Sequence, residues 1–165
     1  MPNKPSENKD SKVVAYDLDG VLMPLLRRYK PYIQYSGEER KRYEKVRLWQ
    51  YANDVKLLTP TEPEFYIISS RQEKYRPITE MWLHKNGIKA KEVILMDNSL
   101  TFNNILEHKL KYLIEKRIEK YYEDDPKLIK RLTKKLPNLE IVYLERNSQT
   151  VRVEQDITME EQIVF

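Results

Sequence analysis

The chain has 165 residues, no cysteine, two histidines and a net charge of +4. The absence of cysteine excludes disulfides and thiolate chemistry, and no apolar stretch approaches the roughly 18 residues that a membrane-spanning helix needs. With so few histidines, any metal would be held by oxygen ligands, which favours magnesium. The length suits one domain, and we expect a cytoplasmic protein without a membrane partner.

The two ends of the chain are expected to lie outside the folded domain. Residues 1–11 are polar and contain no apolar segment of the kind found in signal peptides, so they are expected to form a disordered tail. The folded domain is predicted to span residues 12–145. Residues 146–165 mix apolar side chains with acids and amides, and they suit an edge strand, a short closing helix or a docking tail.

Strands and helices alternate along the folded part. Short apolar runs predict five strands, and apolar residues at three-to-four spacing predict four helices between them. The strands are expected at 12–16, 65–69, 93–96, 120–122 and 140–144, and the helices at 38–58, 77–86, 104–119 and 126–136. This alternation predicts an α/β fold, a three-layer Rossmann-like parallel sheet with helices on both faces.

The first strand leads into the run Asp17-Leu18-Asp19-Gly20. Side chains two residues apart on a strand project the same way, so Asp17 and Asp19 are expected to meet beyond its carboxyl end. Two carboxylates that close need a cation between them or a proton on one of them. The pair therefore suits a magnesium site with a nucleophilic carboxylate and an acid/base partner. The run also suits an ordinary strand-ending turn, where Asp and Gly are favoured for backbone reasons.

A basic stretch with interleaved tyrosines follows. Between Arg27 and Arg47 there are eight basic residues against three acids. Such a segment can track a phosphate backbone, although a solvated helix face has the same composition. Only 44 residues separate Gly20 from Phe65, and the first predicted helix takes much of this length. Residues 21–37 are therefore expected to form a flap, with a minimal cap domain or none.

In parallel α/β sheets, ligands bind at the carboxyl ends of the strands. Polar residues gather at these predicted ends, and a lysine precedes the fourth strand. Besides the two aspartates, the candidates are Ser69, Ser70, Arg71, Lys109, Glu123, Asp124 and Asp125. A hydroxyl, a lysine and a second group of carboxylates are what magnesium-dependent phosphoryl transfer needs beside its nucleophile.

These candidates also have ordinary structural explanations. The two serines suit the end of a strand, and Asp124-Asp125-Pro126 suits the start of a helix. Lys109 lies among other lysines of the kind found on surfaces, and Lys111 is the alternative to it. Both histidines, His84 and His108, are expected on the surface rather than in a catalytic site.

Taken in order, the motifs resemble those of the haloacid dehalogenase-like hydrolases. The four motifs of that family match Asp17-Leu18-Asp19-Gly20-Val21, Ser69, Lys109 and Glu123-Asp124, and the match extends over about residues 12–145. The resemblance implies a magnesium-dependent phosphatase that works through an aspartyl-phosphate intermediate.

The resemblance also implies a catalytic role for each matched side chain. Asp17 would attack the phosphoryl group. Asp19 would protonate the leaving alcohol and then deprotonate the hydrolytic water. Ser69 would donate a hydrogen bond to a phosphoryl oxygen, and Lys109 would neutralise charge on the phosphoryl group and on Asp17.

The same resemblance implies the metal ligands and the substrate contacts. The metal ligands would be Asp17, the backbone carbonyl of Asp19, and Asp124, with Glu123 and Asp125 as alternatives to Asp124. Substrate contacts would come from Gly20, Ser70 and Arg71. Arg71 also suits a role in orienting its own loop.

Within that superfamily, the layout is most similar to the 3′-phosphatase domain of polynucleotide kinase-phosphatases. The shared features are the D-x-D-G-V-L run, a serine-arginine second motif, a helix like residues 78–83 and a strand like residues 93–96. The second motif here is Ser-Ser-Arg rather than the commoner Ser-Gly-Arg, and the Gly-rich phosphate loop of a kinase half is absent from the sequence. We therefore expect a polynucleotide or nucleotide 3′-phosphate as the substrate. A small-molecule phosphatase and a non-catalytic binding protein of the same fold are the alternatives.

Overall fold

The computed structural model describes residues 11–24, 37–56, 59 and 61–145. Its elements, in chain order, are β1 (Val14–Tyr16), α1 (Gly37–Asn53), β2 (Tyr66–Gln72), the 3-10 helix η1 (Glu73–Tyr75), α2 (Arg76–Lys85), β3 (Glu92–Met96), α3 (Phe102–Glu115), β4 (Lys120–Glu123), α4 (Pro126–Lys135) and β5 (Glu140–Tyr143). The predicted N-terminal tail (apart from residue 11), most of the predicted flap (25–36) and the C-terminal segment 146–165 lie outside the described residues. Among the described helices, none combines the length and the apolar composition that crossing a bilayer requires.

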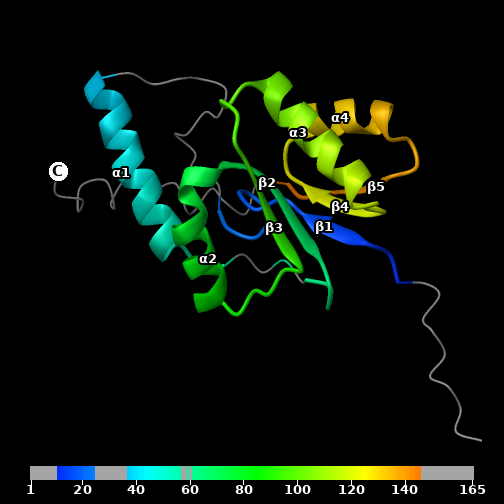
Figure 1. The fold of residues 1–165 in the computed structure, drawn as a ribbon, viewed down its shortest axis with the longest axis horizontal. Helices are drawn as coiled ribbons and strands as arrows, with labels where there is room; N and C mark the ends of the chain where they lie inside the picture. The colour runs from blue at the N-terminus through cyan, green and yellow to red at the C-terminus, as the bar shows by residue number, and fades with distance from the viewer. Residues whose placement is uncertain (1–10, 25–36, 57–58, 60, 146–165) are drawn as a thin grey trace, which may run out of the picture.

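The five strands form one parallel sheet in the order β3-β2-β1-β4-β5. Helices α1 and α2 cover one face of this sheet, and α3 and α4 cover the other (Figure 1). The predicted three-layer α/β fold is therefore confirmed. Strand order reverses between β1 and β4, so the carboxyl ends of these two strands lie at the topological switch point, where ligands bind in sheets of this kind.

The central strand β1 is buried on both faces because helices cover both sides of it. Tyr16 belongs to the core under α1 and α2, where its ring is stacked on Tyr122 at 4.3 Å and meets Phe65 edge-on at 5.2 Å. Ala15 belongs to the core under α3 and α4 and lies beside Tyr121 in the strand register. Because its side chain is so small, Ala15 leaves room for the Tyr121 ring on that face.

The first predicted helix extends too far at its carboxyl end. Helix α1 ends at Asn53, and residues 54–56 are not helical. The side chain of the buried Asp54 accepts the N–H of Val55, and its carbonyl accepts the indole N–H of Trp82 on α2. The side chain and the carbonyl of Asp54 are therefore paired with groups outside the helical hydrogen-bond pattern, and α1 does not continue for a further turn.

The third predicted helix is also displaced, because α3 runs from Phe102 to Glu115. Its start is set by the hydroxyl of Thr101, which accepts the N–H of Asn104. At its end, Arg117 takes a positive φ of 55°, and the N–H of Ile118 turns back to the carbonyl of Leu113. The apolar residues that extended the prediction to 119 belong to this turn and to the entry into β4.

The second strand is longer than predicted, and the predicted flap is shorter. Strand β2 continues to Gln72, so Arg71 lies within the strand and is buried. The N–H groups of residues 21–23 all donate to the carbonyl of Leu18, and their side chains are fully buried. These three residues therefore belong to the core and not to the flap. Between β1 and β2, the described residues contain a single helix, α1, which packs against α2.

Candidate active site

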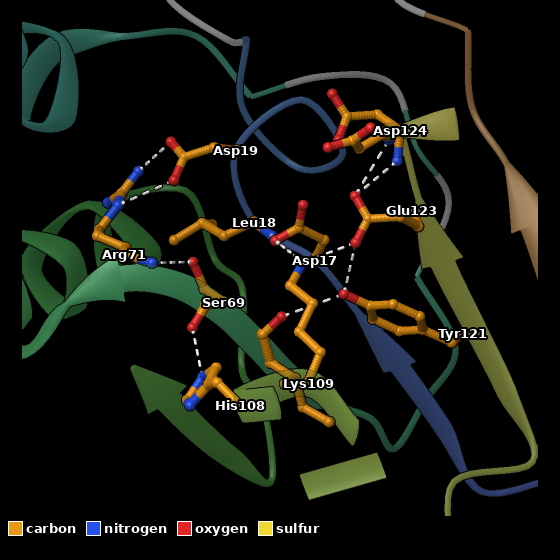
Figure 2. A network of polar contacts seen from close by, with 12 residues as sticks. Asp17, Leu18, Asp19, Ser69, Arg71, His108, Lys109, Tyr121, Glu123 and Asp124 are labelled. Atoms are coloured by element: carbon orange, nitrogen blue, oxygen red, sulfur yellow. Dashed lines mark hydrogen bonds and ion pairs between the residues drawn. The ribbon is translucent and has the colours of Figure 1, made fainter. Parts of the chain in front are cut away.

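Side chains from β1, β2, β4 and α3 converge at the carboxyl end of β1 (Figure 2). Asp17 directly follows β1, Glu123 is the last residue of β4, and Asp124 follows it. All three acids are buried, and each offers a carboxylate oxygen within 4.8 Å of the others. The three acids form a group that can hold a metal ion.

Asp17 is a buried carboxylate with two donors on one oxygen. Its Oδ1 accepts the N–H of Leu18 at 2.8 Å and pairs with Nζ of Lys109 at 3.2 Å. Burial, together with the nearby charge of Glu123, raises the pKa of Asp17 well above its usual value, even though Lys109 acts in the opposite direction. A carboxylate in this position therefore takes up either a proton or a cation.

Lys109 is shared between two carboxylates. Its Nζ lies 2.6 Å from Oε2 of Glu123 and 3.2 Å from Oδ1 of Asp17. Burial opposes the charged amine, but the charges of Asp17 and Glu123 raise the pKa of Lys109 above its usual value. The alternative lysine, Lys111, is exposed on α3. The structure therefore places Lys109 in the site.

The carboxylate of Glu123 is surrounded by donors. Its Oε2 accepts from Lys109 and from the hydroxyl of Tyr121 at 2.8 Å, and its Oε1 accepts the backbone N–H groups of Asp124 and Asp125 at 3.0 and 3.2 Å. Burial alone would raise the pKa of Glu123, but the charge of Lys109 and the hydrogen bonds with Asp124 and Lys109 lower it to about 2. Glu123 therefore anchors the lysine. The role of Tyr121 has no sequence signal beyond its place two residues before Glu123 on the same strand.

The two acids after Glu123 have different surroundings. Oδ1 of Asp125 accepts the N–H groups of Lys127 and Leu128, and it thereby caps α4. Asp124 lies against Gly20, where a Cβ would overlap its Oδ2. Gly20 also has a φ of +85°, which other residues rarely adopt. A glycine at this position is needed both for the turn and for the Asp124 side chain.

Asp19 points away from Asp17 and toward Arg71 (Figure 2). The prediction that the two side chains project the same way is wrong, because β1 ends at Tyr16 and the chain turns at Leu18, so strand alternation does not extend to residue 19. Arg71 donates from Nε to Oδ2 of Asp19 at 3.2 Å and from Nη2 to Oδ1 at 2.6 Å. This bidentate pair fixes the plane of the Asp19 carboxylate.

Arg71 itself is held by residues of α1 and α2, the two helices on one face of the sheet. Its Nη1 donates to Oγ1 of Thr79 on α2 at 2.8 Å, and its guanidinium lies 3.4 Å from the ring centroid of Tyr51 on α1. The side chain of Arg71 is fully buried among these partners. The arginine thus orients Asp19. Its predicted contact with substrate stays a prediction, as does that of the half-buried Ser70.

Ser69 is buried on β2 beside the site. Its hydroxyl oxygen accepts the N–H of Arg71 at 3.0 Å, so its own proton can be donated elsewhere. Its carbonyl oxygen accepts from Nε2 of His108 at 2.8 Å. His108 is thus half-buried on α3, whereas His84 is exposed, as expected. Burial lowers the pKa of His108 to about 4.

Comparison with known proteins gives one structural neighbour. No family model and no curated protein matches the sequence. A chain from the structure of the Pnkp1/Rnl/Hen1 RNA repair complex is similar in fold, with a TM-score of 0.53 and 18% sequence identity. The alignment covers 88% of this chain and 49% of the other, so this chain spans about half the length of its neighbour. At this identity the likeness shows a shared fold.

Proposed function

We propose that this protein is a magnesium-dependent phosphatase of the haloacid dehalogenase-like type that removes a 3′-phosphate from a polynucleotide end. The observation that carries the proposal is the buried Asp17, paired with Lys109 and with Asp124 beside it, at the switch point of the sheet. Fold similarity to a chain of an RNA repair complex supports nucleic acid ends as the substrate class.

The donor set fits magnesium, which prefers carboxylate oxygens and keeps several of its waters. Of the five acids near the site, Glu123 already accepts four hydrogen bonds, Asp125 caps α4, and the carboxylate of Asp19 is paired with Arg71. Asp17 and Asp124 are the two that remain to hold the ion, together with the carbonyl of Asp19 that the family resemblance implies. When bound, magnesium would neutralise charge on these carboxylates and on the phosphoryl oxygens.

Asp17 would act as the nucleophile. Its carboxylate oxygen would form a bond to phosphorus while the ester P–O bond breaks, and Asp19 would give a proton to the departing alkoxide. In the second step Asp19 would take a proton from water, whose oxygen displaces Asp17 from phosphorus and releases inorganic phosphate. Each Asp19 oxygen that accepts from Arg71 keeps a further lone pair, so the arginine does not prevent this proton transfer.

Two side chains would stabilise the transferring phosphoryl group. Lys109 would place a positive charge beside the attacked phosphorus, because its ammonium lies 3.2 Å from the nucleophile. The hydroxyl proton of Ser69 would donate to a phosphoryl oxygen. Both groups are buried and held by other contacts, so little reorganisation would be needed during the reaction.

The experiment is phosphate release with magnesium and with EDTA from four substrates: a 3′-phosphorylated oligonucleotide, a 3′-mononucleotide, a 5′-mononucleotide and an aryl phosphate. Magnesium-dependent release with preference for the oligonucleotide is expected. Release from the small esters alone would overturn the substrate and leave a small-molecule phosphatase. The absence of release from all four would overturn the phosphatase itself.

A further inference from the structure

Helix α4 presents a strongly basic face to solvent. Its ten residues include five basic side chains and no acid, and all five are exposed. Leu128 and Leu132 are buried in the core on the opposite side. At about 100° per residue, Lys127, Lys130, Arg131 and Lys134 fall within about 100° of one another around the helix axis, and they form one stripe that runs from beside the buried side to opposite it.

The cations of α4 differ from those of α1, where the sequence placed the first basic stretch. On α1, Lys41 and Arg47 pair with Glu38 and Glu44. By contrast, Lys130, Arg131 and Lys134 form no ion pair within the described part of the chain. The positive field of α4 is therefore less compensated by its own acids than that of α1.

The basic stripe of α4 begins beside the candidate active site. Asp125, which caps α4, directly follows Asp124. At about 1.5 Å per residue, the stripe from Lys127 to Lys134 is roughly 10 Å long, which matches about three successive phosphates of a stacked strand.

We infer that the α4 stripe binds the phosphodiester backbone of a single-stranded polynucleotide whose 3′-phosphate lies in the site. The inference rests on the proposed function and adds the surface that recognises the substrate. A repeating polyanion suits a stripe of spaced cations. An anionic membrane suits it less, because membrane-surface helices insert an apolar face, and the apolar face of α4 is buried in the core.

The test compares two variants with the same loss of charge. One carries Lys130→Gln, Arg131→Gln and Lys134→Gln on α4, and the other carries Arg40→Gln, Lys41→Gln and Arg42→Gln on α1. All six positions are exposed, and glutamine is a good helix former, so both variants should fold. Binding of a 3′-phosphorylated, single-stranded oligonucleotide is measured by fluorescence anisotropy in EDTA over a range of salt concentrations.

The α4 variant is expected to bind at least about tenfold more weakly at low salt, with a log–log salt slope reduced by about 2, because three phosphate contacts are lost. The α1 variant is expected to stay within about twofold of the parent protein. An unchanged α4 variant, equal losses in both variants, a loss confined to α1, or stronger binding of the parent protein to phosphatidylserine vesicles than to the oligonucleotide would each overturn the inference.

Hydrolysis of the aryl phosphate separates this inference from the proposed function. Both variants should hydrolyse the aryl phosphate at the parent rate, because none of the substituted side chains belongs to the candidate active site. If the parent protein hydrolyses no phosphate ester but the α4 variant loses oligonucleotide binding, the proposed function fails and the binding surface stands. If hydrolysis proceeds and the α4 variant binds normally, the surface fails and the proposed function stands.

Discussion

Asp17 and Asp19 are two residues apart, but they belong to different environments on the two sides of the sheet. Asp17 meets Lys109 from α3, and its side chain is 9% exposed. Asp19 meets Arg71, which α1 and α2 support through Tyr51 and Thr79, and its side chain is 22% exposed. The carboxylate of Asp17 is enclosed beside the ammonium of Lys109. The carboxylate of Asp19 is held at the edge of the site by the planar guanidinium of Arg71. Two chemically identical groups thereby have different surroundings, in keeping with the different roles proposed for them, nucleophile for Asp17 and proton carrier for Asp19.

The largest effect is expected from Asp17→Asn, which removes the proposed nucleophile. Phosphate release should fall to background with every substrate, because an amide cannot form the acyl-phosphate. A matched substitution at Asp125, the acid that caps α4, should leave release close to the parent rate. Circular dichroism would establish that both variants are folded. Substantial turnover by Asp17→Asn would remove Asp17 from the nucleophile role.

Substitutions of Asp19 and of its partner Arg71 should slow the reaction without abolishing it. Asp19→Asn should lower kcat by about 10²–10⁴-fold through the loss of acid/base help. Arg71→Lys keeps the charge but loses the bidentate fork, so it should lower kcat by a smaller factor with little change in KM. The loss of kcat should therefore be larger for Asp19→Asn than for Arg71→Lys. Steady-state kinetics on an aryl phosphate measures both losses. A larger loss from Arg71→Lys than from Asp19→Asn would contradict an orienting role for Arg71.

On the Asp17 side, Lys109 should be important for stability as well as for turnover. Lys109→Met leaves Glu123 as a buried charge without its partner, which should lower the free energy of unfolding by about 3–5 kcal/mol. Urea denaturation measures this loss. The exposed Lys111 supplies the control, since Lys111→Met should change stability by less than about 0.5 kcal/mol.

A smaller effect is expected from Tyr121→Phe, which removes one hydroxyl and keeps the ring. Glu123 then loses one of its four donors, and stability should fall by about 1–2 kcal/mol. If Tyr121 also keeps Lys109 aligned with Asp17, kcat should fall several-fold while KM is unchanged. Tyr122→Phe, on the opposite face of the same strand, is the matched control and should leave kcat at the parent value.

A further effect is a pH dependence of stability that arises from His108. Its pKa is about 4 in the folded protein, against 6.5 ordinarily, because burial and the charges of Lys109 and Lys111 disfavour the imidazolium while Asp97 partly favours it. Between these two values the unfolded chain binds more protons, so stability should decline as the pH falls from about 6.5 toward 4. His108→Gln should reduce the stability difference between pH 7 and pH 5, as measured by urea denaturation. An unchanged difference would show that other groups cause the acid sensitivity.

Much of the fold could be predicted from the sequence, because periodicity and turn residues act locally. The five strands and four helices were all predicted, and the proline and asparagine-glycine signals placed α2 and α4 to within about one residue. The errors lie at the ends of elements, such as Asn53 at the end of α1, where the next residue contacts Trp82 on another element, and Gln72 at the end of β2. Such contacts join residues that are distant in sequence, so they leave no local pattern.

The candidate site could be predicted in part. Asp17 and Ser69 follow from the rule that ligands bind at the carboxyl ends of parallel strands, whereas Lys109 was selected by the family resemblance, and the structure does bring the three residues to one place. The rule did not indicate that Asp19 would turn to Arg71, or that Tyr121 would support Glu123. The first outcome depends on the turn after β1, and the second depends on the packing of Tyr121 beside Ala15 in the core.

By itself, the sequence determined the class of fold, the order of the elements and the kind of chemistry available at the sheet edge, because these depend on residue types and their spacing. Only the tertiary structure separated three adjacent acids by their surroundings: Glu123 bound by four donors, Asp125 capping a helix, and Asp124 beside Asp17 and over Gly20. The physical reason is that a carboxylate's role is decided by which donors and charges reach it. The partners that set Glu123 and Asp124 apart, Lys109 for the one and Asp17 and Gly20 for the other, come from segments 14 to more than 100 residues away in the chain.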